Sequence, residues 1–281
     1  MSCLLYGTEI WGFNHTETME RLQLQFLKQT FGVAKWSPSY AVRLEAGRCK
    51  TEVTVWRMML KFWIKVLKMP PHRTPRKLYD RLKTVSARME ISTNLSSQIK
   101  WILRQVGYEH LWDAEDPKAV VESLDDITNK LAHISWEEDW NFAATSEISY
   151  YFRFLREEPL PAFVTDHPFK QRKTISQLRL ASKLYPFYLI GDHTFGRFNS
   201  ARDCECCNLK SAETIEHFLF VYPRYQSARR HLVVPHILSL HTNGEDSHLI
   251  DIFRDPSEQL TRDIFLYTSS ALKVRNFIMD Q

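Results

Sequence analysis

Three side chains in the last third of the sequence have types and a spacing suited to binding a metal ion. Cys204 and Cys207 form a C-x-x-C pair, and His217 follows on an expected helix. Two thiolates from one tight turn and an imidazole can meet on one zinc ion, but a closed structural site takes four ligands. Tyr222, five residues after His217, stands where a fourth ligand would be and is not a usual zinc ligand. The sequence therefore predicts a zinc site that is weak or lost, and the alternative is a reduced cysteine cluster beside a core histidine.

The cysteines and the hydropathy pattern indicate in which cellular compartment the protein is expected. Of five cysteines, Cys3 and Cys49 are isolated, whereas three crowd into positions 204–207, a distribution that favours metal binding over a disulfide framework. The first residues lack the basic leader and apolar core of a secretory signal. No apolar run approaches the roughly 18 residues of a membrane span. We therefore expect no membrane association and a reducing compartment, the cytoplasm, the nucleus or both.

No catalytic constellation is present in the sequence. It contains no glycine-rich phosphate loop, no G-x-S-x-G and no H-E-x-x-H. The only adjacent aspartates, Asp125 and Asp126, fall in an acidic helical pattern, so we interpret them as surface residues rather than ligands of catalytic metals. We assign no catalytic residue and do not expect this chain alone to be an enzyme.

Charge is strongly segregated along the chain although the net charge is only +4. Residues 1–112 carry a net charge of +10, residues 113–168 carry −9, residues 169–231 carry +6 and residues 232–281 carry −3. Basic blocks rich in aromatic residues are typical of proteins that bind nucleic acid, although solvated helix faces produce the same pattern. The sequence thus predicts four segments: a basic helical region, an acidic connector, a zinc-binding-like region and a helical tail.

The hydrophobic spacing predicts a mainly α-helical fold. One helix should follow Asn14, carry Met19, Leu22, Phe26 and Leu27 on its apolar face, and end at Gly32. Another should begin near Pro38 and end at Gly47. Further helices are expected over about residues 51–69, 78–89, 99–106 and from 116 to 140, with linkers at 70–76 and at the prolines 159, 161 and 168.

The expected helix over residues 51–69 has two distinct faces. Apolar residues recur on one side at helical spacing, and the other side carries Arg57, Lys61, Lys65 and Lys68. Such a stripe can neutralise phosphates without reading bases. This helix is the main candidate for nucleic-acid contact in the basic segment.

Two blocks of the sequence resemble one family of polymerases. The run ETIEHFLFVYPRY at 213–225, with the C-x-x-C pair before it and Arg229 after it, resembles the zinc-binding region of non-LTR (LINE-type) retrotransposon reverse transcriptases. ISQLRL at 175–180 resembles the element that precedes that region. LLYGTEIWG at 4–12, LKQ at 27–29 and AVRLEAGR at 41–48 resemble the thumb of the same proteins. The resemblance covers about residues 1–68 and 174–230.

The resemblance implies binding of RNA and DNA by a helical thumb-like module and a degenerate zinc module. In the family the thumb holds the primer–template duplex, and a cysteine occupies the position of Tyr222. Tyr222 and Tyr225 are candidates for stacking on unpaired bases. The candidate nucleic-acid contacts are Lys28, Arg43, Arg48, Arg57, Lys61, Lys65, Arg179, Arg224 and Arg229.

The sequence lacks the palm aspartates that carry polymerase chemistry in the family, and it lacks an endonuclease. We therefore expect a non-catalytic carboxyl-terminal fragment of a retrotransposon RNA-directed DNA polymerase, which would work with a complete polymerase in trans if it takes part in retrotransposition. Two alternatives remain open. One is a helical protein-interaction scaffold that binds no nucleic acid, and the other is a decayed transposon reading frame without activity.

Overall fold

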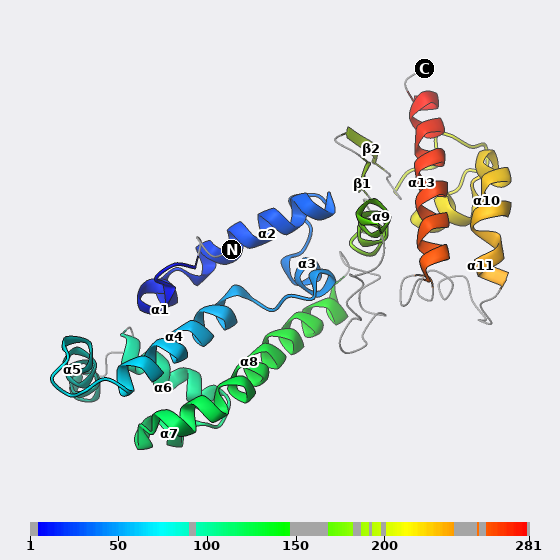
Figure 1. Cartoon of the computed structure of the whole chain (residues 1–281). Coiled ribbons are helices and arrows are strands. Elements are labelled where there is room, and N and C mark those ends of the chain that lie inside the picture. Colours follow the sequence, from blue (N-terminus) through cyan, green and yellow to red (C-terminus); the bar gives the residue numbers. More distant parts are fainter. Residues whose placement is uncertain are drawn as a thin grey trace. The chain divides into compact units, whose positions relative to one another are not determined.

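The computed structural model describes residues 5–89, 94–146, 168–181, 187–190, 193–197, 201–238, 252 and 257–279. It is built mainly of helices, which confirms the predicted fold class (Figure 1). The described part also contains one antiparallel pair of short strands, β1 (Phe187–Ile190) and β2 (His193–Arg197), which the sequence did not lead us to expect. Among the described helices, none combines the length and apolar character needed to cross a membrane.

Backbone contacts divide the chain into two compact units. Unit 1 comprises residues 1–23 and 49–138, and unit 2 comprises residues 24–48 and 139–281. The units meet at three points along the chain, two of which fall inside helices, α2 (Thr16–Phe31) and α8 (Pro117–Thr145), while the third, between residues 48 and 49, lies in the loop before α4 (Thr51–Leu67). The four predicted segments follow charge along the chain and do not coincide with these units, and their first border lies inside α7 (Glu109–Ala114).

Unit 1 is built around α4 (Thr51–Leu67), which is buried on most of its circumference. Met59, Leu60 and Trp63 have no exposed surface, and they share an apolar cluster with residues from α6 and α8. The capping box of Asn94 and Ser97 starts α6 by satisfying amide groups of its first turn. The other helices of this unit are α1 (Thr8–Trp11), η1 (Gly12–Asn14), α5 (Thr74–Met89), α6 (Leu95–Gln105) and α7.

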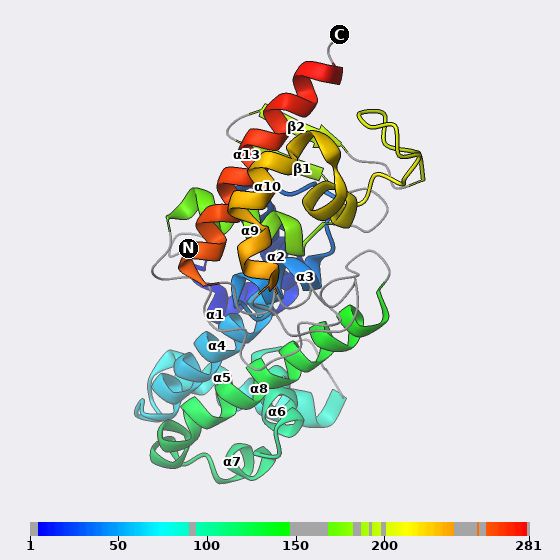
Figure 2. The same cartoon turned by 90° about the vertical axis from the view of Figure 1, so that its right-hand side faces the viewer.

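Unit 2 is built around α13 (Glu258–Met279) and α9 (Phe169–Arg179), which lie side by side (Figure 2). Tyr267 of α13 is fully buried in an apolar cluster with Phe218 and Ile175. The remaining helices described in this unit are α3 (Ser39–Ala46), η3 (His217–Val221), η4 (Pro223–Tyr225), α10 (Gln226–Leu232) and α11 (Val234–Leu238).

Glycines and a proline in the sequence correctly predicted several helix ends. Gly32 follows α2 with a φ of +64°, Gly47 caps α3 with a φ of +58°, and Pro117 opens α8. An added Cβ at position 32 would lie 2.4 Å from Cε of Lys173, but that flexible side chain can move aside, so the positive φ is what requires a glycine there. The predicted linker at 70–76 was too long, since α5 already begins at Thr74.

The predicted apolar face of α2 was partly wrong. Met19 is buried and Leu27 is partly buried, as predicted, but Leu22 is 46% exposed and Phe26 is 66% exposed, whereas Gln23 and Leu24 are buried. The buried face is therefore rotated from the one that the spacing favoured. Neighbouring helices, rather than the pattern of α2 itself, decide which face is covered.

Candidate metal centre

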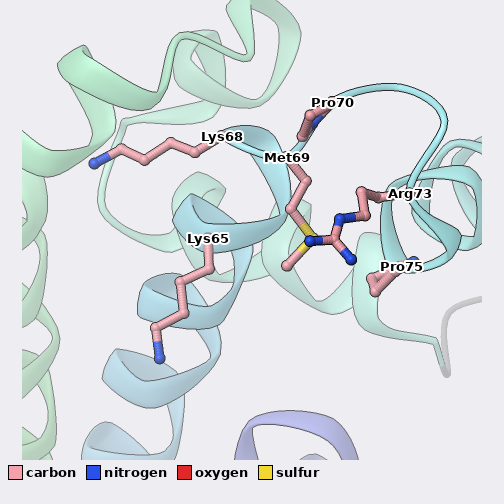
Figure 3. Close-up of a pocket in the computed structure, with 6 residues that line it drawn as sticks. All are labelled: Lys65, Lys68, Met69, Pro70, Arg73 and Pro75. Carbon is pink, nitrogen blue, oxygen red and sulfur yellow. The ribbon is translucent and has the colours of Figure 1, made fainter.

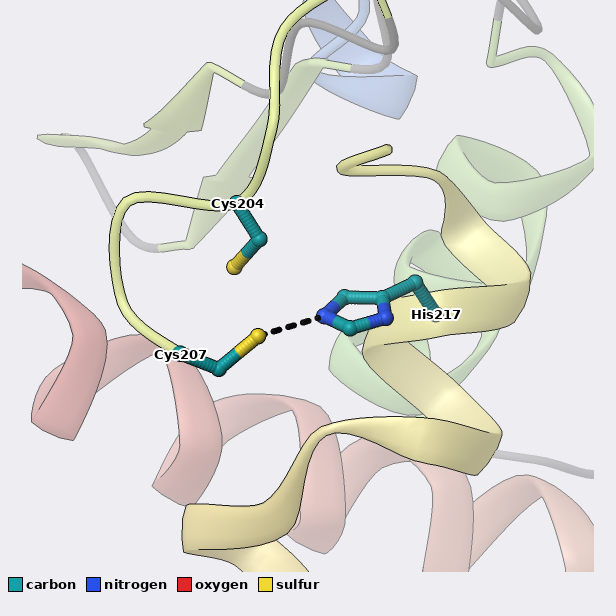
Figure 4. Close-up of side chains that lie close together, drawn as sticks. All are labelled: Cys204, Cys207 and His217. Atoms are coloured by element: carbon teal, nitrogen blue, oxygen red, sulfur yellow. Dashed lines mark hydrogen bonds between the residues drawn. The ribbon is translucent and has the colours of Figure 1, made fainter. Parts of the chain in front are cut away.

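Cys204, Cys207 and His217 come together in unit 2 as the sequence predicts (Figure 4). Their ligand atoms, two sulfurs and one ring nitrogen, all lie within 4.8 Å of one another. Cys204 and His217 are buried, and Cys207 is half-buried. Cys206 is buried too but does not belong to this group.

A short antiparallel turn positions the two cysteines. Asp203 and Ala212 form a β-bridge, and the amide of Cys204 donates to the carbonyl of Ser211 at 2.8 Å. Within the turn, the amide of Cys207 donates to the carbonyl of Cys204 at 3.4 Å, which places the two thiols on one side. Lys210 closes the turn with a φ of +49°.

A π-helical turn positions the histidine. The hydroxyl of Thr214 accepts from the amide of His217 at 3.1 Å, and η3 runs from His217 to Val221 with π geometry. Its closing bond joins the amide of Tyr222 to the carbonyl of His217 at 2.8 Å. Because a π turn brings residues five apart onto one side, the Tyr222 ring lies edge-on to the imidazole, with 5.6 Å between the ring centroids.

Side chains from farther along the chain hold this turn in place. The Arg229 guanidinium donates to the carbonyls of Leu219 at 2.8 Å and Tyr222 at 2.5 Å. The Tyr267 hydroxyl donates to the carbonyl of Phe218 at 2.5 Å. These donors satisfy carbonyls that the π turn leaves free, and so they fix the backbone that carries His217.

An ion pair from α13 secures the segment between the cysteines and the histidine. Arg275 contacts Glu213 at 2.9 Å through Nε and at 2.8 Å through Nη2, and both side chains are largely buried. The sequence analysis did not find this pair, because its members lie 62 positions apart. The same applies to the contact between Tyr267 and η3.

Burial favours the uncharged forms of Cys204 and His217 when no metal is bound. It raises the pKa of the Cys204 thiol, an effect that the nearby Glu213 carboxylate reinforces. Burial and the Arg229 guanidinium both lower the pKa of His217. A metal ion would therefore displace the thiol proton of Cys204 and meet a His217 imidazole whose neutral form is already favoured.

The group fits a tetrahedral metal ion. With zinc–sulfur bonds of about 2.3 Å and zinc–nitrogen bonds of about 2.0 Å, a sulfur and a nitrogen ligand stand roughly 3.5 Å apart. Cys207 Sγ and His217 Nε2 are 3.4 Å apart (Figure 4). The remaining separations between ligand atoms in the group are at most 4.8 Å. The donor set of two thiols and one imidazole is typical of zinc, and it can hold the ion without rearranging the fold.

Three of the predicted nucleic-acid contacts are buried in ion pairs or backbone bonds. Arg43 forms a two-bond pair with Asp139, with distances of 2.7 and 2.5 Å. Arg179 is 2% exposed and pairs with Glu45 at 3.4 Å. Arg229 is occupied by the two carbonyls of the π turn. Because these guanidinium groups do not reach the surface, we remove Arg43, Arg179 and Arg229 from the proposed interface.

The other predicted contacts differ in how accessible they are. Lys28 is half-buried, and it donates to the carbonyl of Lys35 at 2.8 Å while desolvation lowers its pKa. Arg57 pairs with Asp125 at 2.6 Å. Four side chains are exposed and have no acidic partner within the part of the chain that the structure describes: Arg48, Lys61, Lys65 and Arg224.

The structure also tests two interpretations of individual side chains. Tyr222 and Tyr225 are 2% and 4% exposed and stack on each other at 4.4 Å, so the suggestion that they stack on bases is wrong. The surface interpretation of Asp125 and Asp126 is confirmed, since their side chains are 79% and 54% exposed on α8.

Comparison with protein-family models, curated proteins and solved structures found no match for this chain.

Proposed function

We propose that this chain is a non-catalytic nucleic-acid-binding protein related to the thumb and zinc-binding region of LINE-type reverse transcriptases. The basic stripe on α4 contacts the phosphates of RNA or DNA without reading the bases. Cys204, Cys207 and His217 bind a structural zinc ion, and a complete polymerase in trans is the partner for any role in retrotransposition. The resemblance of the two sequence blocks supports the family assignment, and the proposal places the protein in the cytoplasm, the nucleus or both.

The main support for this proposal is a row of lysines without acidic partners, two in α4 and one, Lys68, directly after it. Lys61, Lys65 and Lys68 are exposed at helical spacing along one face, and none has an acidic partner among the described residues. In contrast, Arg57 on the same helix and Lys50 just before it are paired with acids of α8. The stripe thus keeps its charge, which is what backbone neutralisation requires.

Salt dependence tests the nucleic-acid part of the proposal. If the full chain neutralises about four to six phosphates, log affinity should fall with log salt at a slope of roughly −3 to −5. The variant Lys61→Glu/Lys65→Glu should flatten this slope. The matched control is Lys118→Glu/Lys130→Glu, which makes the same charge change at exposed positions on α8. Equal effects of both variants, or no binding at 50 mM salt, would contradict the proposal.

One observation favours the alternative of a protein-interaction scaffold. Acids of α8 neutralise basic residues of the same unit: Glu138 pairs with Lys50 at 2.5 Å and Asp125 with Arg57 at 2.6 Å. This internal pairing is what a chain that binds no nucleic acid would show. The binding assay separates the two functions, because the scaffold predicts no salt-dependent affinity for RNA or DNA.

A further inference from the structure

A pocket lies at the corner where α4 ends and α5 begins (Figure 3). Its volume is about 500 Å³, within the range of small-ligand sites. Three of its side chains are cationic and three are apolar, and no acid lines it. The lining residues are Lys65, Lys68, Met69, Pro70, Arg73 and Pro75.

The cationic side chains of the pocket form no ion pair within the described part of the chain. Lys65, Lys68 and Arg73 are exposed and have no acidic partner there. Neighbouring cations on α5 are different, since Arg76 pairs with Asp80 at 3.0 Å and with Glu115 at 3.1 Å. Three unpaired cations around one hollow make an anion the favoured occupant.

The corner itself is stiff, whereas the cationic side chains can rearrange. The amide of Arg73 donates to the carbonyl of Pro70 at 3.0 Å, and Pro70 and Pro75 fix their own φ angles. In Figure 3 the ammonium groups of Lys65 and Lys68 point away from each other, and the Arg73 guanidinium lies toward Met69. Long side chains without partners can turn toward an anion at little cost.

The apolar wall of the pocket, formed by Met69, Pro70 and Pro75, indicates which kind of anion fits. A duplex presents its phosphates and the edges of its bases but not the base faces, which are stacked inside, and the open stripe of Lys61 and Lys65 suits its phosphates. A pocket that joins cations to Met69 and two prolines also offers contact for a base that is unpaired. The guanidinium plane of Arg73 adds a surface on which a base can stack.

The geometry points to a binding site for one unpaired nucleotide of a nucleic acid, with its phosphate held by Lys65 and Lys68 and its base against Met69 and Arg73. This site deepens the proposed function, on which it rests. It lets the protein prefer a duplex that ends in a single-stranded tail over a blunt duplex.

Three DNA ligands test the site with the full chain. They share one duplex core and are blunt, or carry a four-nucleotide single-stranded tail, or carry an abasic tail with the same phosphates. We expect the tail with bases to raise affinity by roughly fivefold or more over the abasic tail. Calorimetric titration with unlabelled DNA avoids competition from a dye for the apolar wall.

Two variants assign the effect to the pocket. Lys68→Gln/Arg73→Gln should abolish the advantage of the tail with bases. Lys61→Gln, a change on the same stripe outside the pocket, should weaken binding to all three ligands and keep that advantage. Thermal unfolding should be similar for both variants, because all three side chains are exposed.

The outcomes separate this site from the general proposal. Equal affinity for the two tails, or an advantage that survives Lys68→Gln/Arg73→Gln, would overturn the nucleotide site while binding to the blunt duplex still supports the proposed function. A preference for the tail with bases and no affinity for the blunt duplex would support the site and contradict duplex binding by α4. No affinity for any ligand would overturn both.

Discussion

The Tyr222 ring lies edge-on to the imidazole of His217, 5.6 Å from it between ring centroids, because a π turn joins the two residues. The backbone thus places residue 222 beside His217, a proposed zinc ligand. Tyr222 is 2% exposed, and its hydroxyl has no hydrogen-bond partner in the described part of the chain. Position 222 thus borders the proposed metal site, and its phenol side chain does not suit a zinc ion.

Replacing Tyr222→Cys should therefore strengthen zinc binding. A thiolate at this position would complete a tetrahedral set with Cys204, Cys207 and His217, whereas a phenol with a pKa near 10 offers no anion at neutral pH. Competition with a chromogenic chelator should show at least a tenfold rise in affinity, about 1.4 kcal/mol. Tyr222→Phe is the control and should not raise it.

Cys204→Ala completes this test. It should weaken zinc binding in the natural chain and in the Tyr222→Cys variant. If neither Tyr222→Cys nor Cys204→Ala changes the affinity, the group is a reduced cysteine cluster and the zinc assignment fails.

Zinc should also change how stability depends on alkaline pH. Since burial raises the pKa of Cys204, the metal-free fold gains stability from the neutral thiol below the unfolded pKa of about 8.5 and loses it as pH rises toward the folded value. With zinc bound the thiol is already ionised, so this loss should disappear.

Thermal unfolding between pH 7.5 and 9.5 measures this difference. In chelator the Tm should fall by roughly 2–4 °C more than in zinc, as expected for ~1 kcal/mol in a chain of this size. Cys204→Ala in chelator should show a weaker decline. Identical pH profiles with and without zinc would count against a bound metal.

The chain should show neither polymerase nor nuclease activity on its own. Phosphoryl transfer by two metal ions needs carboxylates that converge from separate elements, whereas Asp125 and Asp126 are exposed neighbours on one helix. Primer extension on a primed RNA template with magnesium should give no product. Extension that Asp125→Asn/Asp126→Asn abolishes would refute our interpretation of these residues.

Signals confined to a few residues made part of the structure predictable from the sequence. Gly32, Gly47 and Pro117 mark helix ends because their backbone chemistry acts locally. The cysteines and His217 were found for a similar reason, since one turn and one short helix bring them together.

Features that depend on distant partners were not predictable in this way. Arg43 counted as a surface cation until the structure placed it beside Asp139, 96 positions away. Arg229 has a backbone role that only the π turn reveals. A count of basic residues therefore overestimates the charge available to a polyanion, because it cannot show which cations are already paired.

The pair of Arg43 and Asp139 gives a direct test of this difference between buried and exposed cations. Arg43 is 7% exposed, Asp139 is fully buried, and two hydrogen bonds join them. Removing one partner takes from the other, still buried, the opposite charge and both of these hydrogen bonds. Asp139→Asn or Arg43→Met should thus lower the free energy of unfolding by about 3–5 kcal/mol, measured by urea denaturation.

The double variant Arg43→Met/Asp139→Leu separates the cost of an unpaired charge from the value of the pair. Replacing both partners by apolar side chains of similar size should restore most of the lost stability, because no charge remains buried. Over the range of salt concentrations in which the double variant is folded and binds RNA, the slope of its log affinity against log salt should match that of the natural chain. The reason is that Arg43 lies outside the proposed interface. A flatter slope for the double variant would show instead that Arg43 contacts phosphate, and it would return this residue to the binding surface from which its burial excludes it.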